Sequence, residues 1–333
     1  LVTSEQSGFN NEISKYMILE NNDICTISRN GFEININSNF KYTTHKVVGS
    51  QKVFSPEPYP HWTLKEIHEQ VDAVLNATKL GSRILSNDTV VLGGLESNKE
   101  QLLQLDHIIL LGCGTSYHSG LICMRMLKQL ELFISVQLFD GADFSSVDIP
   151  TTGKSGAILI SQSGETKDLH RCIKICRAHS IFTIGVVNVV DSLIAREVDC
   201  GCYLHAGREV GVASTKAFTS QVIVLTLISI WFAQEKDKSL IERKQMIYDL
   251  RKLYKDIQTT IKTSNDNIES LLAIFQDQTS CFVLGKDMGE SVAREGALKI
   301  KEISYIHAEG YSTSSLKHGP FALLKKDFPV IIL

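Results

Sequence analysis

The stretch L-G-C-G-T-S-Y-H-S, residues 111–119, decides how the rest of the sequence is interpreted. It follows the apolar run 107–111 and precedes residues 120–130, which are compatible with a helix. A strand that ends at glycines and hydroxyl side chains and then enters a helix directs main-chain N–H groups and the positive end of the helix dipole at one point. This arrangement predicts an anion-binding loop.

A second stretch of the same kind, S-Q-S-G-E-T at residues 161–166, directly follows the apolar run 157–160. Its hydroxyl and amide groups suit a phosphate monoester, which is small, doubly charged and rich in hydrogen-bond acceptors. The alternative is that each loop only caps its helix, since Ser and Thr are common there. Loops after neighbouring parallel strands meet at the carboxyl edge of a sheet, where open α/β sheets bind ligands. The pair of loops therefore favours one shared phosphate site.

Length and composition restrict the class of protein. A chain of 333 residues allows two or three domains, and 43% apolar with 21% charged residues is typical of a soluble globular protein. The net charge of −3 gives no reason to expect nucleic acid as a partner. The longest apolar-rich stretch, 222–233, is too short to span a bilayer, and no signal peptide is recognisable. We therefore expect a cytoplasmic protein without a membrane partner.

The eight cysteines form no C-x-x-C pair, and several lie in apolar runs. This distribution indicates reduced thiols instead of a disulfide framework or a zinc site. The chain begins at Leu1 without Met and ends inside the apolar run 328–333, so we interpret it as part of a longer protein.

Strand-like and helix-like segments alternate through residues 103–235, which predicts an α/β fold with a parallel sheet flanked by helices. The order of apolar run, glycine loop and helix at 108–112 recurs at 281–285. Such a repeat indicates two related subdomains. We place them at 63–238 and 239–333, the second one incomplete.

The residues before these subdomains have a different pattern. Short apolar runs at 14–19 and 23–27 predict a hairpin, and Asn30-Gly31 predicts a turn into a third strand. This β segment, 1–36, is too small to be stable alone. Residues 37–62 are polar, hold three of the six prolines and are predicted to form a linker.

Three charged residues of the helix predicted from about residue 291 share one face, because Glu295, Lys299 and Glu302 are spaced i, i+4 and i+7. The simpler alternative is a solvated charged stripe. The functional alternative is a glutamate base with a lysine beside it, facing a sugar phosphate.

The segment after this helix favours the functional alternative. Residues 305–315 are predicted to form a long loop rich in Ser and Gly, followed by L-K-H-G-P at 316–320. An exposed His318 can act as an acid or base near neutral pH. We interpret His118 and His307 as structural. The stretch 207–220 is another polar loop, which either binds ligand near Ser214 or caps the helix after it.

The motifs occur in one order along the chain: G-C-G-T-S-Y (112–117), S-Q-S-G-E-T (161–166), G-V-A-S-T-K-A (211–217), E-G-A-L-K-I-K-E-I-S-Y-I-H-A-E (295–309) and L-K-H-G-P (316–320). Together they resemble the glutamine–fructose-6-phosphate aminotransferases, the glucosamine-6-phosphate synthases of hexosamine biosynthesis. The resemblance covers residues 12–333. Residues 12–36 resemble the tail of a glutaminase domain, and those from 60 onward resemble an isomerase part built of two SIS subdomains.

This resemblance implies that fructose 6-phosphate and ammonia from glutamine become glucosamine 6-phosphate, without a metal or organic cofactor. The glutamine chemistry implies a glutaminase domain that this chain lacks. In the family, Glu302 corresponds to the base that moves a proton between C1 and C2, with Lys299 beside it. His318 corresponds to the histidine proposed to open the sugar ring in the neighbouring subunit's site, which implies a homodimer or higher homo-oligomer. The resemblance also implies substrate-binding roles for Thr115, Ser116, Ser161, Gln162, Ser163, Thr166, Val212 and Ser214.

The sequence departs from the family in three places. In eukaryotic members the feedback inhibitor UDP-N-acetylglucosamine binds near a segment that resembles 195–203, and this chain has Ala195, Val198 and Tyr203 where those members tend to have Ser, Thr and His, so we expect weakened or lost feedback at this site. The family's Schiff-base lysine lies in a C-terminal tail beyond this chain, so we expect the fragment alone not to complete the reaction. Ser314-Ser315 replaces the Gly-Glu that usually precedes L-K-H-G-P. Two alternatives remain, a stand-alone SIS sugar isomerase or deaminase and a non-catalytic SIS sensor of sugar phosphates. The β segment argues against the first, and the joint presence of Glu302, Lys299 and His318 argues against the second.

Overall fold

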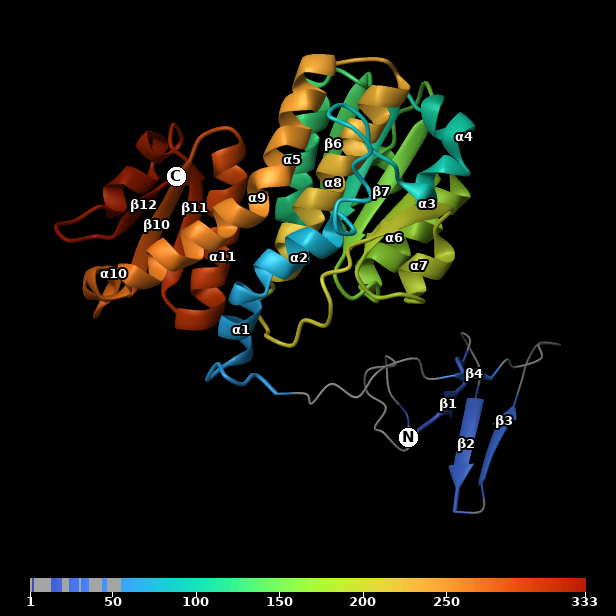
Figure 1. The fold of residues 1–333 in the computed structure, drawn as a ribbon, viewed down its shortest axis with the longest axis horizontal. Coiled ribbons are helices and arrows are strands. Elements are labelled where there is room, and N and C mark those ends of the chain that lie inside the picture. The colour runs from blue at the N-terminus through green and yellow to red at the C-terminus, as the bar shows by residue number, and fades with distance from the viewer. Residues whose placement is uncertain (1, 3–12, 20–23, 30, 36–43, 47–54) are drawn as a thin grey trace. The chain divides into compact units, whose positions relative to one another are not determined.

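The computed structural model describes residues 2, 13–19, 24–29, 31–35, 44–46 and 55–333. The chain divides into two compact units, Leu1–Ser55 and Pro56–Leu333 (Figure 1). The predicted domain boundaries stay predictions.

The first unit contains two short antiparallel pairs. Strand β1 (Lys15–Tyr16) pairs with β4 (His45–Lys46), and β2 (Ile24–Ser28) pairs with β3 (Gly31–Asn35). The predicted third strand is therefore present, with Asn30 itself outside the described residues. The predicted pairing of 14–19 with 23–27 is wrong, because β1 satisfies its main-chain groups against β4, inside the predicted linker.

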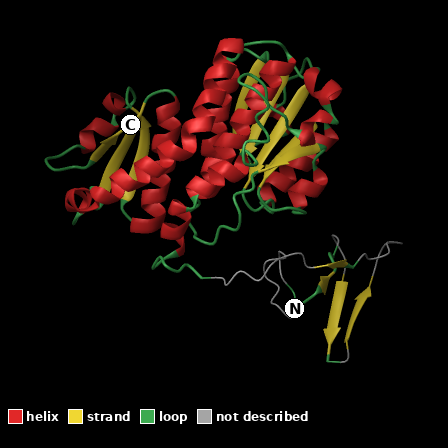
Figure 2. Cartoon of the chain, viewed as in Figure 1, coloured by secondary structure: helices red, strands yellow, loops and turns green. Residues whose placement is uncertain are grey.

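The second unit contains a five-stranded parallel sheet in the order β6-β5-β7-β8-β9 (Figure 2). The sequence predicts strands at 107–111, 134–139, 157–160 and 183–189, which correspond to the first four of these strands; it does not predict the fifth, a short edge strand. The strands are β5 (His107–Gly112), β6 (Ser135–Asp140), β7 (Ser155–Ser161), β8 (Phe182–Val187) and β9 (Cys200–Tyr203).

The central strands are apolar throughout because helices cover both faces of the sheet. Ile108 and Leu110 belong to the core cluster with α5 and α8, whereas Ile109 and Leu111 belong to the cluster with α6 and α7. All four side chains are fully buried. The α/β fold expected from the sequence is confirmed. The helices of this subdomain are α1 (Trp62–His68), α2 (Gln70–Ala77), α3 (Gly93–Glu96), α4 (Lys99–Leu103), α5 (Thr115–Gln129), α6 (Lys167–Ala178), α7 (Leu193–Glu197) and α8 (Lys216–Glu235).

Helix α8 is a core helix. Its length and composition alone would allow it to cross a membrane, but 78% of its most apolar window is buried inside the protein. Trp231 and Phe232 are fully buried, and the indole of Trp231 donates to Glu96 Oε1 at 2.7 Å. The apolar character of α8 is therefore explained by its packing between the sheet and its neighbouring helices.

The smaller subdomain contains a three-stranded parallel sheet in the order β11-β10-β12. The expected long loop at 305–315 is wrong, because residues 307–312 form β11 beside β10. Packing explains this polar strand: Ala308 is fully buried, and a Cβ on Gly310 would lie 2.5 Å from the Cα of Arg294 on α11. Its elements are α10 (Ile268–Phe275), β10 (Ser280–Gly285), α11 (Met288–Ser304), β11 (His307–Ser312) and β12 (Val330–Ile332), with short 3₁₀ turns at Leu316–His318 and Pro320–Leu323. Helix α9 (Leu240–Asp266) precedes them and packs on the larger subdomain, where Ile247 and Leu250 join its core cluster.

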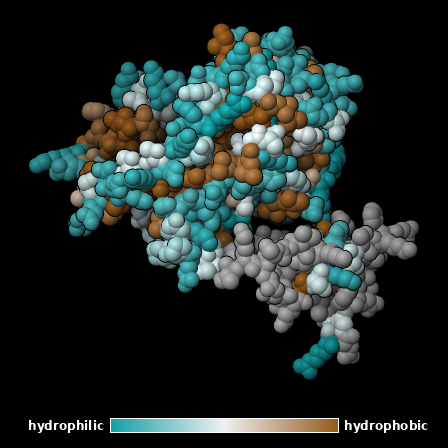
Figure 3. Space-filling view, in the orientation of Figure 1, coloured by the Kyte–Doolittle hydropathy of each residue, from teal (hydrophilic) through white to brown (hydrophobic). Residues whose placement is uncertain are grey.

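Apolar side chains are exposed on this smaller subdomain, around the end of the chain (Figure 3). Ile332 is 72% exposed and Leu333 57%, and Phe321 and Leu323 are exposed nearby in the sequence. Two of these side chains belong to or follow β12, a strand at the edge of its sheet. The exposed apolar side chains therefore lie at or near one edge of the smaller sheet, whereas the central strands of the larger sheet are buried.

The two subdomains repeat the same strand–loop–helix junction. Gly114 precedes α5 with φ 54° and ψ −123°, and Asp287 precedes α11 with φ 52° and ψ −118°. A Cβ on Gly112 would lie 2.8 Å from the main chain of Ser116, and one on Gly285 would lie 2.0 Å from Gly289 O. The helix start therefore approaches the strand end so closely that glycine is required. This geometry supports the internal repeat found in the sequence.

Replacing Asp287 with glycine should raise the free energy of unfolding by about 1 kcal/mol, because a residue with a Cβ is strained at this main-chain conformation. The Asp287 side chain makes no helix-capping hydrogen bond that would be lost. Urea denaturation of wild type and variant measures the change. Asp287→Ala is the control, since it keeps the Cβ; equal stability of the Gly and Ala variants would contradict the strain argument.

All eight cysteines are free thiols. Burial raises the pKa of Cys113, Cys172 and Cys202 to about 11. Burial also raises the pKa of Cys123 and Cys200 to about 12. A thiol with a raised pKa is protonated at neutral pH and is a poor nucleophile.

These pKa shifts predict alkaline destabilisation. The folded-state pKa values exceed the unfolded value of about 9, so the thiols contribute stability that is complete below pH 9 and is lost as pH rises through 11 to 12. We expect the free energy of unfolding to fall steadily as the pH rises from 9 to about 12. Urea denaturation at fixed pH steps measures this fall. Cys123→Ala should make the slope shallower, and an unchanged slope would show that other groups cause it.

Candidate functional site

The two predicted anion-binding loops start at the same edge of one sheet. Strands β5 and β7 are neighbours and parallel, with Leu111 opposite Leu159. The loop after β5 leads into α5 at Thr115, and the loop after β7 leads into α6 at Lys167. The prediction of neighbouring strand ends is confirmed, and two helix N-termini begin beside this edge (Figure 1).

The hydroxyls of the second loop shape the loop itself. Ser161 Oγ lies 3.0 Å from Thr166 Oγ1 and accepts from the main-chain N–H of Gly164 at 2.9 Å. Ser163 Oγ accepts from the N–H of Glu165 at 3.1 Å. Gln162 and Ser163 are partly buried. In the first loop the buried Ser116 Oγ accepts from Gln221 Nε2 at 2.9 Å. The loops are therefore held in defined conformations by hydrogen bonds of their own side chains.

A charged network connects the first loop to α11 of the smaller subdomain. Lys299 Nζ lies 2.7 Å from Glu302 Oε2 and 3.3 Å from Glu295 Oε1. It also donates to Thr115 Oγ1 at 3.0 Å. Thr115 Oγ1 in turn donates to Glu295 Oε1 at 2.9 Å. The predicted charged face of α11 therefore meets the anion-binding loop directly, through contacts between residues about 180 positions apart in sequence.

Burial in the network decreases from Glu295 to Glu302. The Glu295 side chain is 6% exposed, that of Lys299 is 20% and that of Glu302 is 29%. Glu302 forms an ion pair with Lys299. The angles at the two charged groups do not fit a hydrogen bond. The Glu302 carboxylate is thus held by a cation at the more exposed end of the network.

Two members of the network were missed as site residues by the sequence analysis. Glu295 was recognised only as part of the charged face, and His118 was interpreted as structural. His118 Nδ1 lies 2.7 Å from Glu295 Oε2, so the pair spans the two subdomains. The i, i+4, i+7 spacing was a usable signal for Glu295, whereas nothing in the sequence links His118 to α11.

The loop 207–214 lies before α8 and carries two of the predicted sugar-binding residues. Val212 is 94% exposed. Ser214 Oγ donates to Glu209 Oε2 at 2.8 Å, and Glu209 Oε1 accepts from the main-chain N–H of Thr215 at 2.8 Å. A carboxylate therefore occupies the start of α8, which agrees with the capping alternative.

His318 lies in an exposed 3₁₀ turn, Leu316–His318, after β11. No hydrogen bond or ion pair joins it to the network around Lys299 within the described residues. The structure thus brings together Thr115, Lys299 and Glu302 in one chain, but not His318.

The described part of the chain offers other features less suited to chemistry. It contains no group of three or more His, Cys, Asp or Glu residues placed to hold a metal ion. Cys113 lies in the first loop, where burial, followed by the nearby Asp140 charge, raises its pKa to about 11. We therefore exclude Cys113 as a nucleophile at neutral pH.

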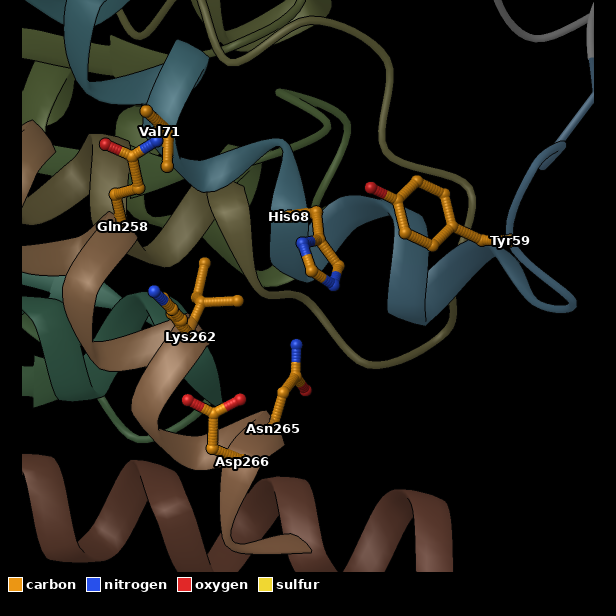
Figure 4. A pocket seen from close by; sticks show the side chains of 8 residues that line it. Tyr59, His68, Val71, Gln258, Lys262, Asn265 and Asp266 are labelled. Atoms are coloured by element: carbon orange, nitrogen blue, oxygen red, sulfur yellow. The ribbon is translucent and has the colours of Figure 1, made fainter.

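A cavity of about 530 Å³ lies between α9 and the α1–α2 segment (Figure 4). Tyr59 stacks on His68 at its rim, with ring centroids 4.8 Å apart, and Lys262, Asn265 and Asp266 line the opposite wall. It shares no residue with the charged network. The cavity therefore does not define the candidate site.

Comparison with known proteins agrees with this geometry. The SIS domain family model matches residues 101–230 and 274–333. The chain is 44% identical over 333 residues to a probable glutamine–fructose-6-phosphate aminotransferase (isomerizing) of Acanthamoeba polyphaga mimivirus, covering all of this chain and 54% of that protein. It is 38% identical over 270 residues to glutamine–fructose-6-phosphate aminotransferase (isomerizing) 2 of Homo sapiens, covering 81% of this chain and 39% of that protein.

Solved structures show the same relationship. The C-terminal domain of glucosamine-fructose-6-phosphate aminotransferase from Francisella tularensis superposes with a TM-score of 0.76 and 31% identity, over 84% of this chain and 77% of that one. Tagatose-6-phosphate ketose/aldose isomerase from Escherichia coli, 19% identical with a TM-score of 0.65 over 82% of this chain and 73% of that one, shows the shared fold. This chain spans about half the length of its mimivirus relative. The chain belongs to the SIS-domain family, and within it to the C-terminal isomerase part of the glutamine–fructose-6-phosphate aminotransferases.

Proposed function

We propose that this chain is the isomerase part of an enzyme that converts fructose 6-phosphate and glutamine-derived ammonia into glucosamine 6-phosphate, in hexosamine (UDP-N-acetylglucosamine) biosynthesis. The observation that carries the proposal is the contact of Lys299 with both Thr115, at the phosphate loop, and Glu302. A base placed beside an anion-binding loop can act on carbon atoms of a sugar whose phosphate that loop holds.

In this proposal the phosphate is bound by hydroxyl, amide and main-chain N–H groups where α5 and α6 begin. The sugar extends from there toward α11. The binding residues are Thr115, Ser116, Ser161, Gln162, Ser163, Thr166, Val212 and Ser214.

Ammonia first replaces the C2 carbonyl oxygen, which leaves as water, to give a C2 imine. Glu302 then removes a proton from C1 and returns one to C2, while the C1 hydroxyl loses its proton and the nitrogen gains one, so that the C2 imine becomes a C2 amine with the carbonyl at C1. The Lys299 ammonium stabilises the negative charge that develops on the sugar oxygen during this transfer. His318 opens the sugar ring in the site of a neighbouring subunit. The exposed position of His318 supports this role, because a side chain away from its own network is free to serve another.

The proposed partners are a glutaminase domain, which supplies ammonia, and a second copy of the chain. The proposed location of the protein is the cytoplasm. The function is tested by incubating the full-length protein with fructose 6-phosphate and glutamine and measuring glucosamine 6-phosphate by mass spectrometry. Formation that depends on glutamine supports the proposal. Isomerisation of the sugar phosphate regardless of glutamine would indicate a stand-alone isomerase, and binding without turnover would indicate a sensor.

A further inference from the structure

Glu66 on α1 holds the loop that carries Val212 and Ser214. It is 1% exposed, and its Oε1 accepts from the main-chain N–H of Val210 at 2.5 Å. The N–H of Gly211 lies 3.2 Å from Oε1 and 3.1 Å from Oε2. A carboxylate is costly to bury unless donors compensate it, and here consecutive amides of one loop supply them.

The fit between α1 and this loop requires a glycine. A Cβ on Gly211 would lie 2.7 Å from Glu66 Oε2 and 2.8 Å from Thr63 Oγ1. Any side chain at this position would therefore push the loop away from α1. A Cβ at this position would therefore displace the Glu66 carboxylate or the Thr63 hydroxyl from its place against the loop.

The loop is also fixed where it enters α8. Lys216, the first residue of α8, is 4% exposed and lies 2.6 Å from Glu69 Oε2 at the junction of α1 and α2. Glu209 Oε2 accepts from Ser214 Oγ at 2.8 Å, two residues before Lys216. With both ends of the loop held, Val212 remains 94% exposed between them.

We propose that Glu66 is a positioning residue for the sugar site. It fixes residues 210 and 211 against α1, so that the main chain at Val212 and the hydroxyl of Ser214 face the sugar before it binds. The inference rests on the proposed function, because sugar contacts of Val212 and Ser214 belong to that proposal. Glu66 itself does not touch the sugar; it lowers the cost of ordering the loop when the sugar binds.

The test uses Glu66→Ala in the full-length protein, with fructose 6-phosphate as the probe. Isothermal titration calorimetry should show a dissociation constant about tenfold higher than that of wild type, because the loop is no longer held in place. KM should rise more than kcat falls. Amide hydrogen exchange should become faster in residues 207–214. Glu66→Gln keeps one acceptor oxygen, so its dissociation constant and its exchange rate in residues 207–214 should lie between those of wild type and Glu66→Ala.

The matched control is Leu102→Ala. Leu102 is fully buried on α4, which precedes β5 and therefore lies near the amino ends of the strands, away from the loop. This substitution should lower thermal stability at least as much while the dissociation constant stays unchanged. Equal effects of both variants on the dissociation constant, or unchanged exchange in residues 207–214 of Glu66→Ala, would overturn the inference. A wild type that does not bind fructose 6-phosphate would refute the proposed function instead, and exchange would then decide whether Glu66 holds the loop.

Discussion

Replacing Glu302 with glutamine should lower kcat for glucosamine 6-phosphate formation about a thousandfold, within the range attributed to a general base. The amide has the shape of the carboxylate but cannot take a proton from carbon. Because the phosphate loops are untouched, the dissociation constant of fructose 6-phosphate should change little. Steady-state kinetics and calorimetry on the full-length variant measure the two quantities separately.

The control for this experiment is Glu290→Gln on the same helix. Glu290 pairs with Arg125 and Arg294, and neither pair includes Lys299 or Thr115. Partly exposed ion pairs contribute at most about 1 kcal/mol to stability, so this variant should fold and retain near-normal kcat. Equal losses in the two variants would mean that any charge removed from α11 is harmful. A normal rate in the Glu302 variant would remove Glu302 from the mechanism.

The sequence was sufficient to predict the elements that have strong local signals. The apolar runs at 107–111 and 157–160 became buried neighbouring strands, because a strand covered on both faces needs apolar residues throughout. The glycine and hydroxyl pattern after each run predicted both loops. The spacing of Glu295, Lys299 and Glu302 predicted their common face, since the helical period is fixed.

The elements that were missed depend on long-range packing. Strand β11 is polar and contains glycine, so its pattern indicated a loop; it forms because β10 offers main-chain partners and α11 packs closely over Gly310. The pairing of β1 with β4 likewise depends on a segment about thirty residues away. The partnership of His118 with Glu295 arises only when the two subdomains meet. Sequence periodicity describes one element at a time and cannot supply such contacts.

Replacing Gly164 with alanine should destabilise the protein by about 3 kcal/mol and weaken binding of fructose 6-phosphate. Gly164 has φ +70°, a conformation that is strained for residues with a Cβ, and the added Cβ would lie 2.0 Å from Ser192 Oγ and 2.4 Å from Ser192 Cβ. Gly164 N–H also donates to Ser161 Oγ, so any shift of this residue displaces the phosphate loop. Urea denaturation and calorimetry measure the two effects.

The double variant Gly164→Ala/Ser192→Gly separates the two causes, because it removes the colliding side chain and keeps the strained φ. The hydroxyl of Ser192 is buried without a hydrogen-bond partner in the described part of the chain, so Ser192→Gly alone breaks no side-chain bond. We expect the double variant to recover most of the stability, leaving a deficit of about 1 kcal/mol from backbone strain. A double variant as unstable as Gly164→Ala would show that strain at φ +70°, and not the contact with Ser192, is what restricts this position to glycine.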